Sequence, residues 1–137
     1  MAASPLWIRY GVTFASAGAR FAAGLEAAAT ILVADAGDEI AGFVWCEPRG
    51  AFARSGYIPL IGVQPDQTSQ GVGARLLAAA EAHFRSVSSD VFLLVSDFNA
   101  GAQRFYERQG YHQVGALPDY VLPGITELIY RKRLPPT

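Results

Sequence analysis

The sequence predicts a mixed α/β fold, because two kinds of apolar pattern alternate along the chain with glycine and proline between them. The run Val91–Val95 is apolar throughout, as expected of a strand covered on both faces. Between Val72 and Phe84, apolar residues recur every four positions, which predicts a helix from about Gly71 to Arg85. A strand–turn–helix–strand unit therefore lies at the centre of the chain.

Before this unit, the chain also alternates between strand and helix patterns. The alanine-rich stretch Ser16–Ala29 predicts an amphipathic helix. Pro48 begins a predicted loop that lasts until about Ser55. Strands are predicted at Leu6–Tyr10, Ile31–Ala34, Ile40–Cys46 and Tyr57–Val63. The second and third of these strands form a hairpin through the turn Asp35–Asp38.

After the unit, a short helix and two strands complete the predicted fold. Asn99 is a favoured N-cap for a helix through Gln109, and Gly110 suits the position just after that helix. Two strands follow, at Tyr111–Gly115 and Thr126–Arg133.

Composition limits the functional classes that we consider. Residues 1–137 are enough for a single domain, and 51% of them are hydrophobic. Eleven basic and twelve acidic residues give a net charge of −1, which argues against nucleic-acid or membrane partners. Cys46 is the single cysteine, and no apolar run approaches the roughly 18–20 residues that cross a bilayer. Met1–Arg9 lacks the pattern of a signal peptide, so we expect a cytoplasmic protein.

The centre of the chain has features of an anion-binding site. A strand ends at Val63, Pro65-Asp66 turns the chain, and Gly71-Val72-Gly73 opens a helix. Glycines allow close approach to the backbone, and the first free N–H groups of a helix attract phosphate. The simpler alternative is that the glycines only permit a tight turn. A P-loop and a dinucleotide fingerprint fit less well, because Ala74-Arg75 and Leu76 stand where those motifs need other residues.

Two blocks together resemble the coenzyme A-binding segments of the GNAT N-acetyltransferase family. The first is Val63-x-Pro65-Asp66 followed by Gln70–Leu77, and the second is Asn99-x-x-Ala102-x-x-Phe105-Tyr106 followed by Gly110-Tyr111. The resemblance covers roughly Ile31 to Leu134. It implies one GNAT domain with a mixed, mostly antiparallel sheet that is splayed between its fourth and fifth strands and flanked by helices.

The resemblance also implies acetyl-CoA as co-substrate, no metal, and a role for each matching residue. Backbone groups of Ile61, Gly62 and Val63 would contact pantetheine and the acetyl carbonyl. The amides of Ser69, Gln70, Gly71, Val72, Gly73 and Ala74 would hold the pyrophosphate. Asn99 would bind the pantetheine arm. Tyr106 would face the sulfur, where donating a hydrogen bond to the thiolate is as plausible as protonating it.

The sequence departs from the family pattern at two points. Thr68 stands where the family has Arg or Gln, with Arg75 and Arg104 as candidate replacements. The carboxylate expected of the general base is missing, since the fourth strand has Pro59 and Leu60 there and the fifth has Leu94. Acidic residues near strand ends are Glu47, Asp97 and Glu127, and for each the simpler expectation is a solvated surface carboxylate.

The missing base bears on the acceptor. Deprotonating a lysine-like amine at pH 7 costs about 4.6 kcal/mol, whereas an α-amine costs about 1 kcal/mol. This comparison favours an α-amine or another weakly basic nitrogen, so we expect a small-molecule amine or a peptide α-amine as acceptor. The family resemblance implies that its pocket is shaped by the loops Phe14–Leu25, Arg49–Ser55 and Leu117–Gly124, with Phe52 and Tyr120 as candidate walls.

We predict an N-acetyltransferase that moves an acetyl group from acetyl-CoA to a primary amine by direct transfer in a ternary complex. One alternative is a non-catalytic acyl-CoA-binding regulatory module, and another is a structural domain that lost the cofactor. The oligomeric state is open, with a homodimer as one alternative. Cys46 reads as a core residue, and His83 and His112 show no metal-ligand spacing.

Overall fold

The computed structural model describes residues 6–10, 30–36, 39–65 and 71–135. Its strands are β1 (Leu6–Tyr10), β2 (Thr30–Ala36), β3 (Glu39–Ala51), β4 (Ser55–Val63), β5 (Asp90–Ser96), β6 (His112–Pro118) and β7 (Thr126–Arg133). Its helices are α2 (Val72–Phe84) and α3 (Ala100–Arg108). The helix predicted at Ser16–Ala29 lies outside the described residues, as do Thr68, Ser69 and Gln70.

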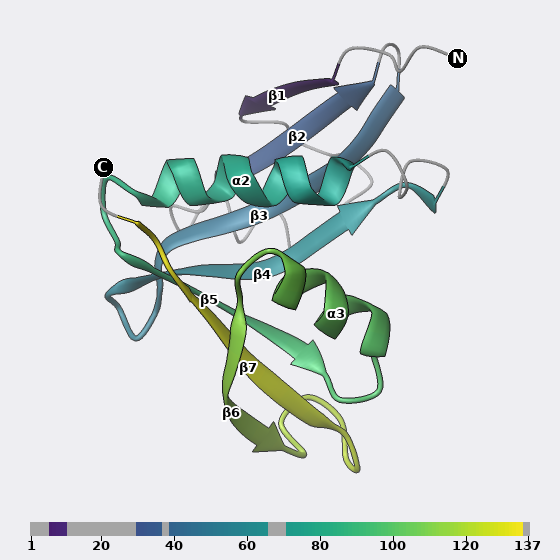
Figure 1. Ribbon diagram of the computed structural model, residues 1–137, viewed down its shortest axis with the longest axis vertical. Helices are drawn as coiled ribbons and strands as arrows, with labels where there is room; N and C mark the ends of the chain where they lie inside the picture. Colours follow the sequence, from purple (N-terminus) through teal and green to yellow (C-terminus); the bar gives the residue numbers. More distant parts are fainter. Residues whose placement is uncertain (1–5, 11–29, 37–38, 66–70, 136–137) are drawn as a thin grey trace.

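The strands form one sheet in the order β1-β2-β3-β4-β5-β7-β6 (Figure 1). Every neighbouring pair is antiparallel except β4 and β5, which are parallel. Both described helices lie on one face of this sheet (Figure 1). The predicted mixed, mostly antiparallel α/β architecture is therefore confirmed.

The main core lies between this face and the helices. The predicted apolar face of α2 is buried, and it comprises Val72, Leu76, Leu77, Ala80 and Phe84. Phe84 fits because β4 has a glycine beneath it: a Cβ at Gly56 would lie 2.7 Å from the Phe84 ring. On the opposite face, Ile31, Val33 and Trp45 form a second buried cluster. Successive strand residues point to opposite faces, so β2 contributes to both clusters.

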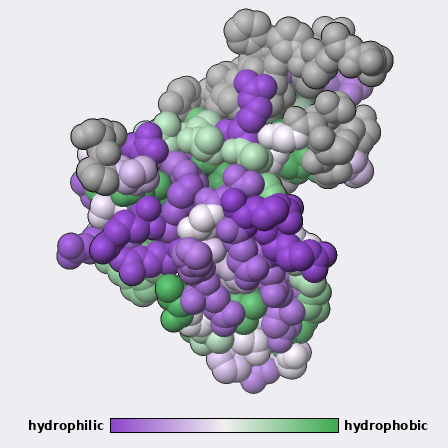
Figure 2. All heavy atoms as spheres, viewed as in Figure 1, coloured by the Kyte–Doolittle hydropathy of each residue, from purple (hydrophilic) through white to green (hydrophobic). Residues whose placement is uncertain are grey.

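Figure 2 shows the helix-bearing face of the molecule. Hydrophilic side chains gather over α3, where Arg104, Glu107 and Arg108 are exposed. The surface of α2 is more apolar, because its outward positions include Ala78 and Ala82. Neither described helix is long and apolar enough to cross a membrane.

Two predictions about strands need correction. The loop predicted from Pro48 is mostly strand, since β3 continues to Ala51 and only residues 52–54 turn. Proline is tolerated there because the register with β4 is irregular between Glu47 and Ala51. Strand β5 is buried on alternate residues, Val91, Leu93 and Val95, rather than on both faces. The described helices cover only one of its faces.

Strands β4 and β5 diverge, as the family resemblance implied. They pair only at Gly56↔Val91, Tyr57↔Phe92 and Ile58↔Leu93, although both continue beyond these residues. Strand β4 also has an irregular register with β3. Tyr57 pairs with Glu47 and Leu60 pairs with Trp45, so an advance of three residues on β4 matches an advance of two on β3. This is a β-bulge over Ile58–Pro59. Because proline has no N–H to donate, the ladder to β5 ends where the bulge begins.

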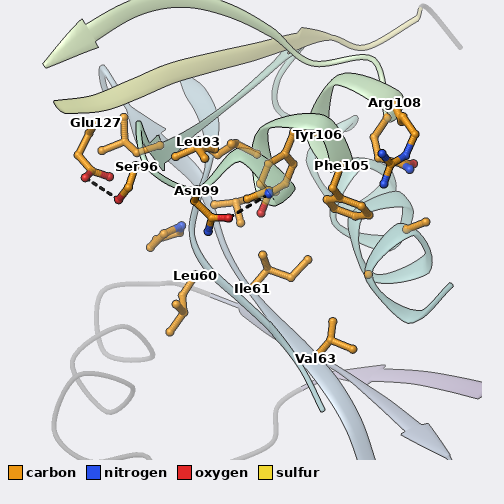
Figure 3. Close-up of a pocket in the computed structure, with 18 of the residues that line it drawn as sticks. Leu60, Ile61, Val63, Leu93, Ser96, Asn99, Phe105, Tyr106, Arg108 and Glu127 are labelled. Atoms are coloured by element: carbon orange, nitrogen blue, oxygen red, sulfur yellow. Dashed lines mark hydrogen bonds between the residues drawn. The ribbon is translucent and has the colours of Figure 1, made fainter. Parts of the chain in front are cut away.

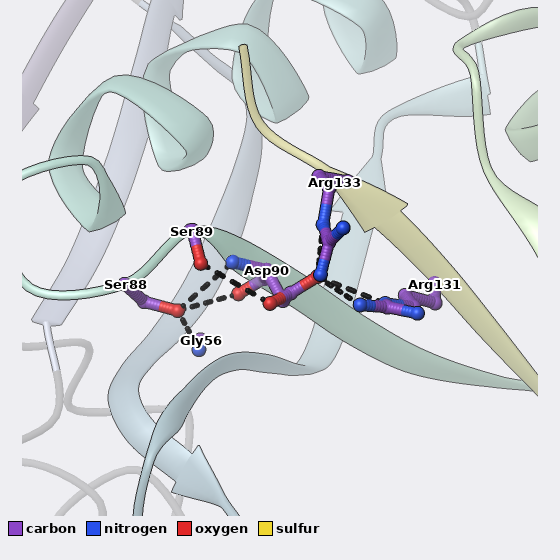
Figure 4. Close-up of polar contacts among 6 residues, drawn as sticks. All are labelled: Gly56, Ser88, Ser89, Asp90, Arg131 and Arg133. Carbon is purple, nitrogen blue, oxygen red and sulfur yellow. Dashed lines mark hydrogen bonds and ion pairs between the residues drawn. The ribbon is translucent and has the colours of Figure 1, made fainter. Parts of the chain in front are cut away.

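Polar contacts hold the other ends of β4 and β5 together (Figure 4). The Ser88 hydroxyl oxygen accepts hydrogen bonds from the Gly56 N–H at 3.2 Å and the Asp90 N–H at 3.1 Å. The Asp90 carboxylate binds Arg131, with Nη2 to Oδ1 at 2.8 Å, and lies 3.6 Å from Nε of Arg133. The Ser88 contact ties β4 to the start of β5, whereas the Asp90 ion pairs tie β5 to β7. The β4–β5 opening is therefore closed at this end, and its strands are unpaired toward Val63 and Ser96.

Candidate active site

A cavity of about 700 Å³ occupies the opening between β4 and β5. Its walls are β4 beyond the bulge, the second half of β5, the first turn of α2, one side of α3, and the start of β7. Figure 3 shows the side chains that line it. The residues that line it include Pro59, Leu60, Ile61, Val63, Gly71, Gly73, Ala74, Leu94, Ser96, Asn99, Phe105, Tyr106, Arg108 and Glu127.

The N-terminus of α2 opens onto the cavity through backbone groups. Gly71 is left-handed, with φ 74°, and a Cβ there would meet nothing within 4 Å. The first helical hydrogen bond runs from the N–H of Arg75 to the carbonyl of Gly71. The preceding N–H groups, from Val72 to Ala74, therefore have no intrahelical acceptor. With no acidic residue in the first turn, this helix end is suited to an anion.

Gly73 has a packing role as well. A Cβ at this position would lie 3.1 Å from Cζ of Phe105, so the absence of a side chain lets α3 approach α2. Gly71 thus fits both the anion-site and the tight-turn explanations, whereas the helix contact of Gly73 belongs to neither. Gly71 provides the backbone conformation, and Gly73 provides the close helix contact.

Strand β4 offers its backbone to the cavity. Its pairing with β5 stops at Ile58, so the edge of Ile61–Val63 that faces the opening has no strand partner among the described residues. Ile61 and Val63 line the cavity and also pack against the main core. Gly62 is explained by packing, because a Cβ there would lie 2.6 Å from the Phe43 ring.

Asn99 caps α3, as the sequence predicts. Its Oδ1 accepts a hydrogen bond from the Ala102 N–H at 3.1 Å, and its side chain lines the cavity (Figure 3). The cap uses only the oxygen. Among the described residues, the side-chain NH₂ group therefore remains a donor for a ligand.

Tyr106 is buried in the wall between α3 and the cavity. Burial raises the pKa of its phenol to about 12. Its ring packs edge-on against Phe105 and Tyr111, with centroids 5.1 and 5.9 Å away. Within the described part of the chain, the Tyr106 hydroxyl makes no hydrogen bond. Tyr106 is therefore a neutral donor held in place by ring packing.

The packing behind Tyr106 includes a buried charge. The Tyr111 hydroxyl donates a 2.9 Å hydrogen bond to Glu81, and Nζ of Lys132 lies 2.9 Å from the other Glu81 oxygen. Burial, and then the negative charge of Glu81, raise the pKa of Tyr111. This network joins α2 to β7 through the residue that supports Tyr106.

The candidate bases fall in different places. Pro59, Leu60 and Leu94 line the cavity. The strand positions where the family resemblance implies a carboxylate therefore face the cavity with apolar side chains. Asp97 is exposed, as predicted. Glu47 is half-buried on β3 and lies outside the cavity lining.

For Glu127, the prediction of a solvated carboxylate is wrong. It is 8% exposed, lines the cavity, and accepts a 2.8 Å hydrogen bond from the Ser96 hydroxyl (Figure 3). Glu127 lies directly opposite Ser96 in the β5–β7 ladder. That register joins residues 31 positions apart, so no local pattern announces it.

Sequence reasoning also missed Arg108. It lines the cavity from the last turn of α3, whereas Arg75 and Arg104 are exposed and lie outside the lining. A signal was present, because Arg108 follows Phe105 by three residues and therefore shares its helix face. Phe52 and Tyr120, the predicted acceptor walls, are exposed at 79% and 64% and do not line the cavity. The predicted acceptor loop Phe14–Leu25 lies outside the described residues.

Cys46 is buried in the main core, as predicted, and burial raises its pKa to about 12. Among the described residues, no three His, Cys, Asp or Glu side chains gather as metal ligands would.

Comparisons with known proteins agree with this geometry. A family model described as Acetyltransferase (GNAT) family matches residues 6–111. Blasticidin-S acetyltransferase of Streptomyces morookaense is 35% identical over 78 residues, which are 57% of this chain and 57% of that protein. Mycothiol acetyltransferase of Salinispora tropica is 33% identical over 101 residues, which are 71% of this chain and 33% of that protein. The matches thus span just over half of one relative and a third of the other.

The fold has solved counterparts. A GNAT family acetyltransferase from Elizabethkingia anophelis, solved with acetyl-CoA bound, has a TM-score of 0.80 at 14% identity, covering 94% of this chain and 98% of that one. This likeness concerns the fold alone. Because the family model spans most of the chain, the protein belongs to the GNAT acetyltransferase family.

Proposed function

We propose that the protein is an acetyl-CoA-dependent N-acetyltransferase that acetylates a primary amine by direct transfer. One observation carries this proposal. The opening between β4 and β5 brings a free helix N-terminus, the Asn99 amide and the Tyr106 hydroxyl onto one cavity. Acetyl-CoA has three groups that match these features in the same order. They are the pyrophosphate anion, the amide-bearing pantetheine chain and the thioester sulfur.

The described residues suit the co-substrate. The N–H groups of residues 72–74 would bind the pyrophosphate together with Ser69, Gln70 and Gly71. The free backbone edge of Ile61–Val63 would pair with the amides of pantetheine, and Asn99 would donate to them. Arg108 adds a positive charge to the same cavity. The phosphate groups of CoA would therefore meet hydrogen-bond donors and the positive charge of Arg108. The first turn of α2 has no acidic residue that would repel them.

The chemistry then follows from two groups. A backbone N–H on the free edge of β4 would stabilise the carbonyl oxygen as the amine adds to the thioester. Tyr106 would hydrogen-bond the departing thiolate. Full proton transfer from a phenol of pKa about 12 to a thiolate near 8.5 is uphill by about 5 kcal/mol. We therefore assign Tyr106 the role of hydrogen-bond donor rather than full acid.

The acceptor class is a small-molecule amine or a peptide α-amine. The two curated relatives are named for different acceptors, blasticidin-S and mycothiol, so similarity at this level does not transfer an acceptor to this chain. We propose that residues 1–137 act as one domain in the cytoplasm, where a lone buried Cys46 stays reduced.

An amine panel tests the proposal. Each amine is mixed with acetyl-CoA and the protein, and release of the free thiol is followed. We expect turnover with at least one primary amine. Calorimetric binding of CoA without turnover across the panel would instead support a regulatory acyl-CoA-binding module. No CoA binding at millimolar concentration would indicate a domain that lost the cofactor.

A further inference from the structure

The cavity has opposite charges at its two ends. Of the described residues that line it, Arg108 is the one basic side chain and Glu127 the one acidic side chain. Figure 3 shows the pair Glu127 and Ser96 at one end of the row of side chains and Arg108 at the other. The intervening labelled residues of α3 and its cap are Asn99, Phe105 and Tyr106. The polyanionic cofactor fits the Arg108 end, so the Glu127 end is left for a group of the opposite charge.

Glu127 also lies on a different face of the sheet from the cofactor groups. On β7, Tyr130 bonds to Glu107 of α3 and Lys132 bonds to Glu81 of α2. These even-numbered residues therefore face the helices. Because side chains alternate along a strand, Glu127 faces the other side of the sheet. The cavity thus receives cofactor-binding groups from one face and a carboxylate from the other.

The environment of Glu127 is suited to a positively charged group of a ligand. Its carboxylate is largely removed from solvent, and among the described residues it has one hydrogen-bond partner, the Ser96 hydroxyl. An ionised carboxylate has about four acceptor positions, so a single hydrogen bond leaves acceptors unused. A buried carboxylate with spare acceptors is well matched to an ammonium group.

We propose that Glu127, oriented by Ser96, binds the ammonium of the acceptor and takes the proton that must leave it before attack. This inference rests on the proposed acetyltransferase function and identifies its acceptor subsite. The acceptor is accordingly a primary amine that is charged at neutral pH, and it enters from the face opposite α2 and α3.

One N–H proton of the ammonium passes to the Glu127 carboxylate, which frees the nitrogen lone pair. That pair forms the N–C bond, and the C–S bond then breaks with its electrons on sulfur. The nitrogen loses a second proton, and the thiolate gains one as CoA is released. The net products are the amide, CoA thiol and one proton, which leaves Glu127 through solvent.

Glu127→Gln tests the proposal, because glutamine keeps the size and the oxygen that accepts from Ser96. Steady-state rates are compared for an alkylamine, which is charged at neutral pH, and an aromatic amine, which is not. We expect kcat/KM for the alkylamine to fall 100-fold or more, within the range of a general base. The aromatic amine should lose less than 5-fold, and the CoA dissociation constant should change less than 2-fold. Asp97→Asn, which removes a neighbouring exposed carboxylate, should leave both rates unchanged.

Equal losses for both amines, or weaker CoA binding in parallel, would overturn the proposal in favour of a structural role for Glu127. If Glu127→Gln lowers the melting temperature strongly, Ser96→Ala serves as the second variant. It should impair the alkylamine more than the aromatic amine.

A binding experiment separates this inference from the proposed function. Butylammonium is titrated calorimetrically into the CoA-saturated wild type and Glu127→Gln proteins. Weaker binding to the variant supports the subsite even if no amine in the panel is acetylated, an outcome that would overturn only the proposed function. Equal binding, or no binding to wild type at 10–100 mM, would overturn the subsite.

Discussion

The rings of Tyr106 and Tyr111 meet edge-on, with centroids 5.9 Å apart, and Tyr111 in turn donates its hydroxyl hydrogen to Glu81. The position of Tyr106 in the cavity wall therefore depends on residues that do not touch the cavity. Two kinds of change follow from this relationship. Some remove a group that faces the cavity, and others loosen the packing behind it.

Removing the Tyr106 hydroxyl belongs to the first kind. Tyr106→Phe keeps the ring contacts and deletes only the donor, so kcat should fall roughly 100-fold, as for loss of one donor to a developing negative charge. The CoA dissociation constant, measured calorimetrically, should stay within 2-fold. Tyr130→Phe is the matched control, because it also loses one hydroxyl, which donates to Glu107 outside the cavity. An unchanged kcat for Tyr106→Phe with a good substrate would remove Tyr106 from the mechanism.

The raised pKa of Tyr106 predicts how this difference depends on pH. Since burial raises the pKa to about 12, the phenol stays protonated and able to donate up to at least pH 10. The ratio of wild-type to Tyr106→Phe kcat should therefore be constant from pH 6 to pH 10. A ratio that declines toward one between pH 8 and pH 10 would show that the phenol ionises earlier and that its pKa is not raised.

Lys132→Met belongs to the second kind of change. Lys132 is paired with Glu81, whose side chain is 9% exposed, so the substitution leaves a buried carboxylate whose remaining partner among the described residues is Tyr111. We expect a loss of about 3 kcal/mol in the free energy of unfolding, measured with urea. Arg133→Met is the control, because Arg133 is 74% exposed and 3.6 Å from Asp90, and should cost less than about 1 kcal/mol. Similar costs for both variants would contradict the buried network.

Two glycines predict stability changes of opposite sign. A Cβ at Gly56 would lie 2.7 Å from the Phe84 ring, so Gly56→Ala should destabilise the fold by about 1–3 kcal/mol. In α3, the nearest atom to a Cβ at Gly101 is 3.9 Å away, so Gly101→Ala should stabilise by about 0.5–1 kcal/mol. Thermal unfolding of both variants checks the pair. A neutral Gly56→Ala would mean that Phe84 repacks easily.

The elements that the sequence predicts well are those set by neighbouring residues. Strand β7 begins and ends where predicted, and the apolar spacing of α2 identified its buried face. Asn99 caps α3 through its own side chain. Each of these features depends on contacts within about four residues, so single-sequence patterns are sufficient.

The features that were missed depend on register between distant segments. Glu127 reaches the cavity because β7 pairs with β5 so that it stands opposite Ser96, and a strand shifted by one residue would turn it to the other face. The sequence marks Pro59 only as a position without a base, yet it lies in the bulge where β4 leaves β5. Strand register and bulges depend on contacts between segments that are distant in the sequence. Composition and local periodicity therefore do not predict them.

Asp90 predicts how stability depends on acid. Burial alone would raise the pKa of this carboxyl, but hydrogen bonding and charge from Arg131, with smaller contributions from Ser89 and Arg133, lower it overall. A carboxyl whose folded pKa lies below its unfolded value contributes stability above the unfolded pKa, near 3.8, and loses it as pH falls through the folded value. Asp90→Asn should therefore cost roughly 1–3 kcal/mol at pH 7, as expected for hydrogen bonds to a charged group.

The pH dependence is the sharper part of this prediction. Urea unfolding of both proteins at pH 7, 5 and 3 should give a stability difference that is constant between pH 7 and 5. It should shrink at pH 3, which is below the unfolded pKa of 3.8, because the unfolded chain then binds a proton at Asp90 more readily than the folded protein does. These carboxylate contacts join β5 to β7 beside the closed end of the β4–β5 opening. A difference that is equal at all three pH values would show that Asp90 stabilises this junction without its charge.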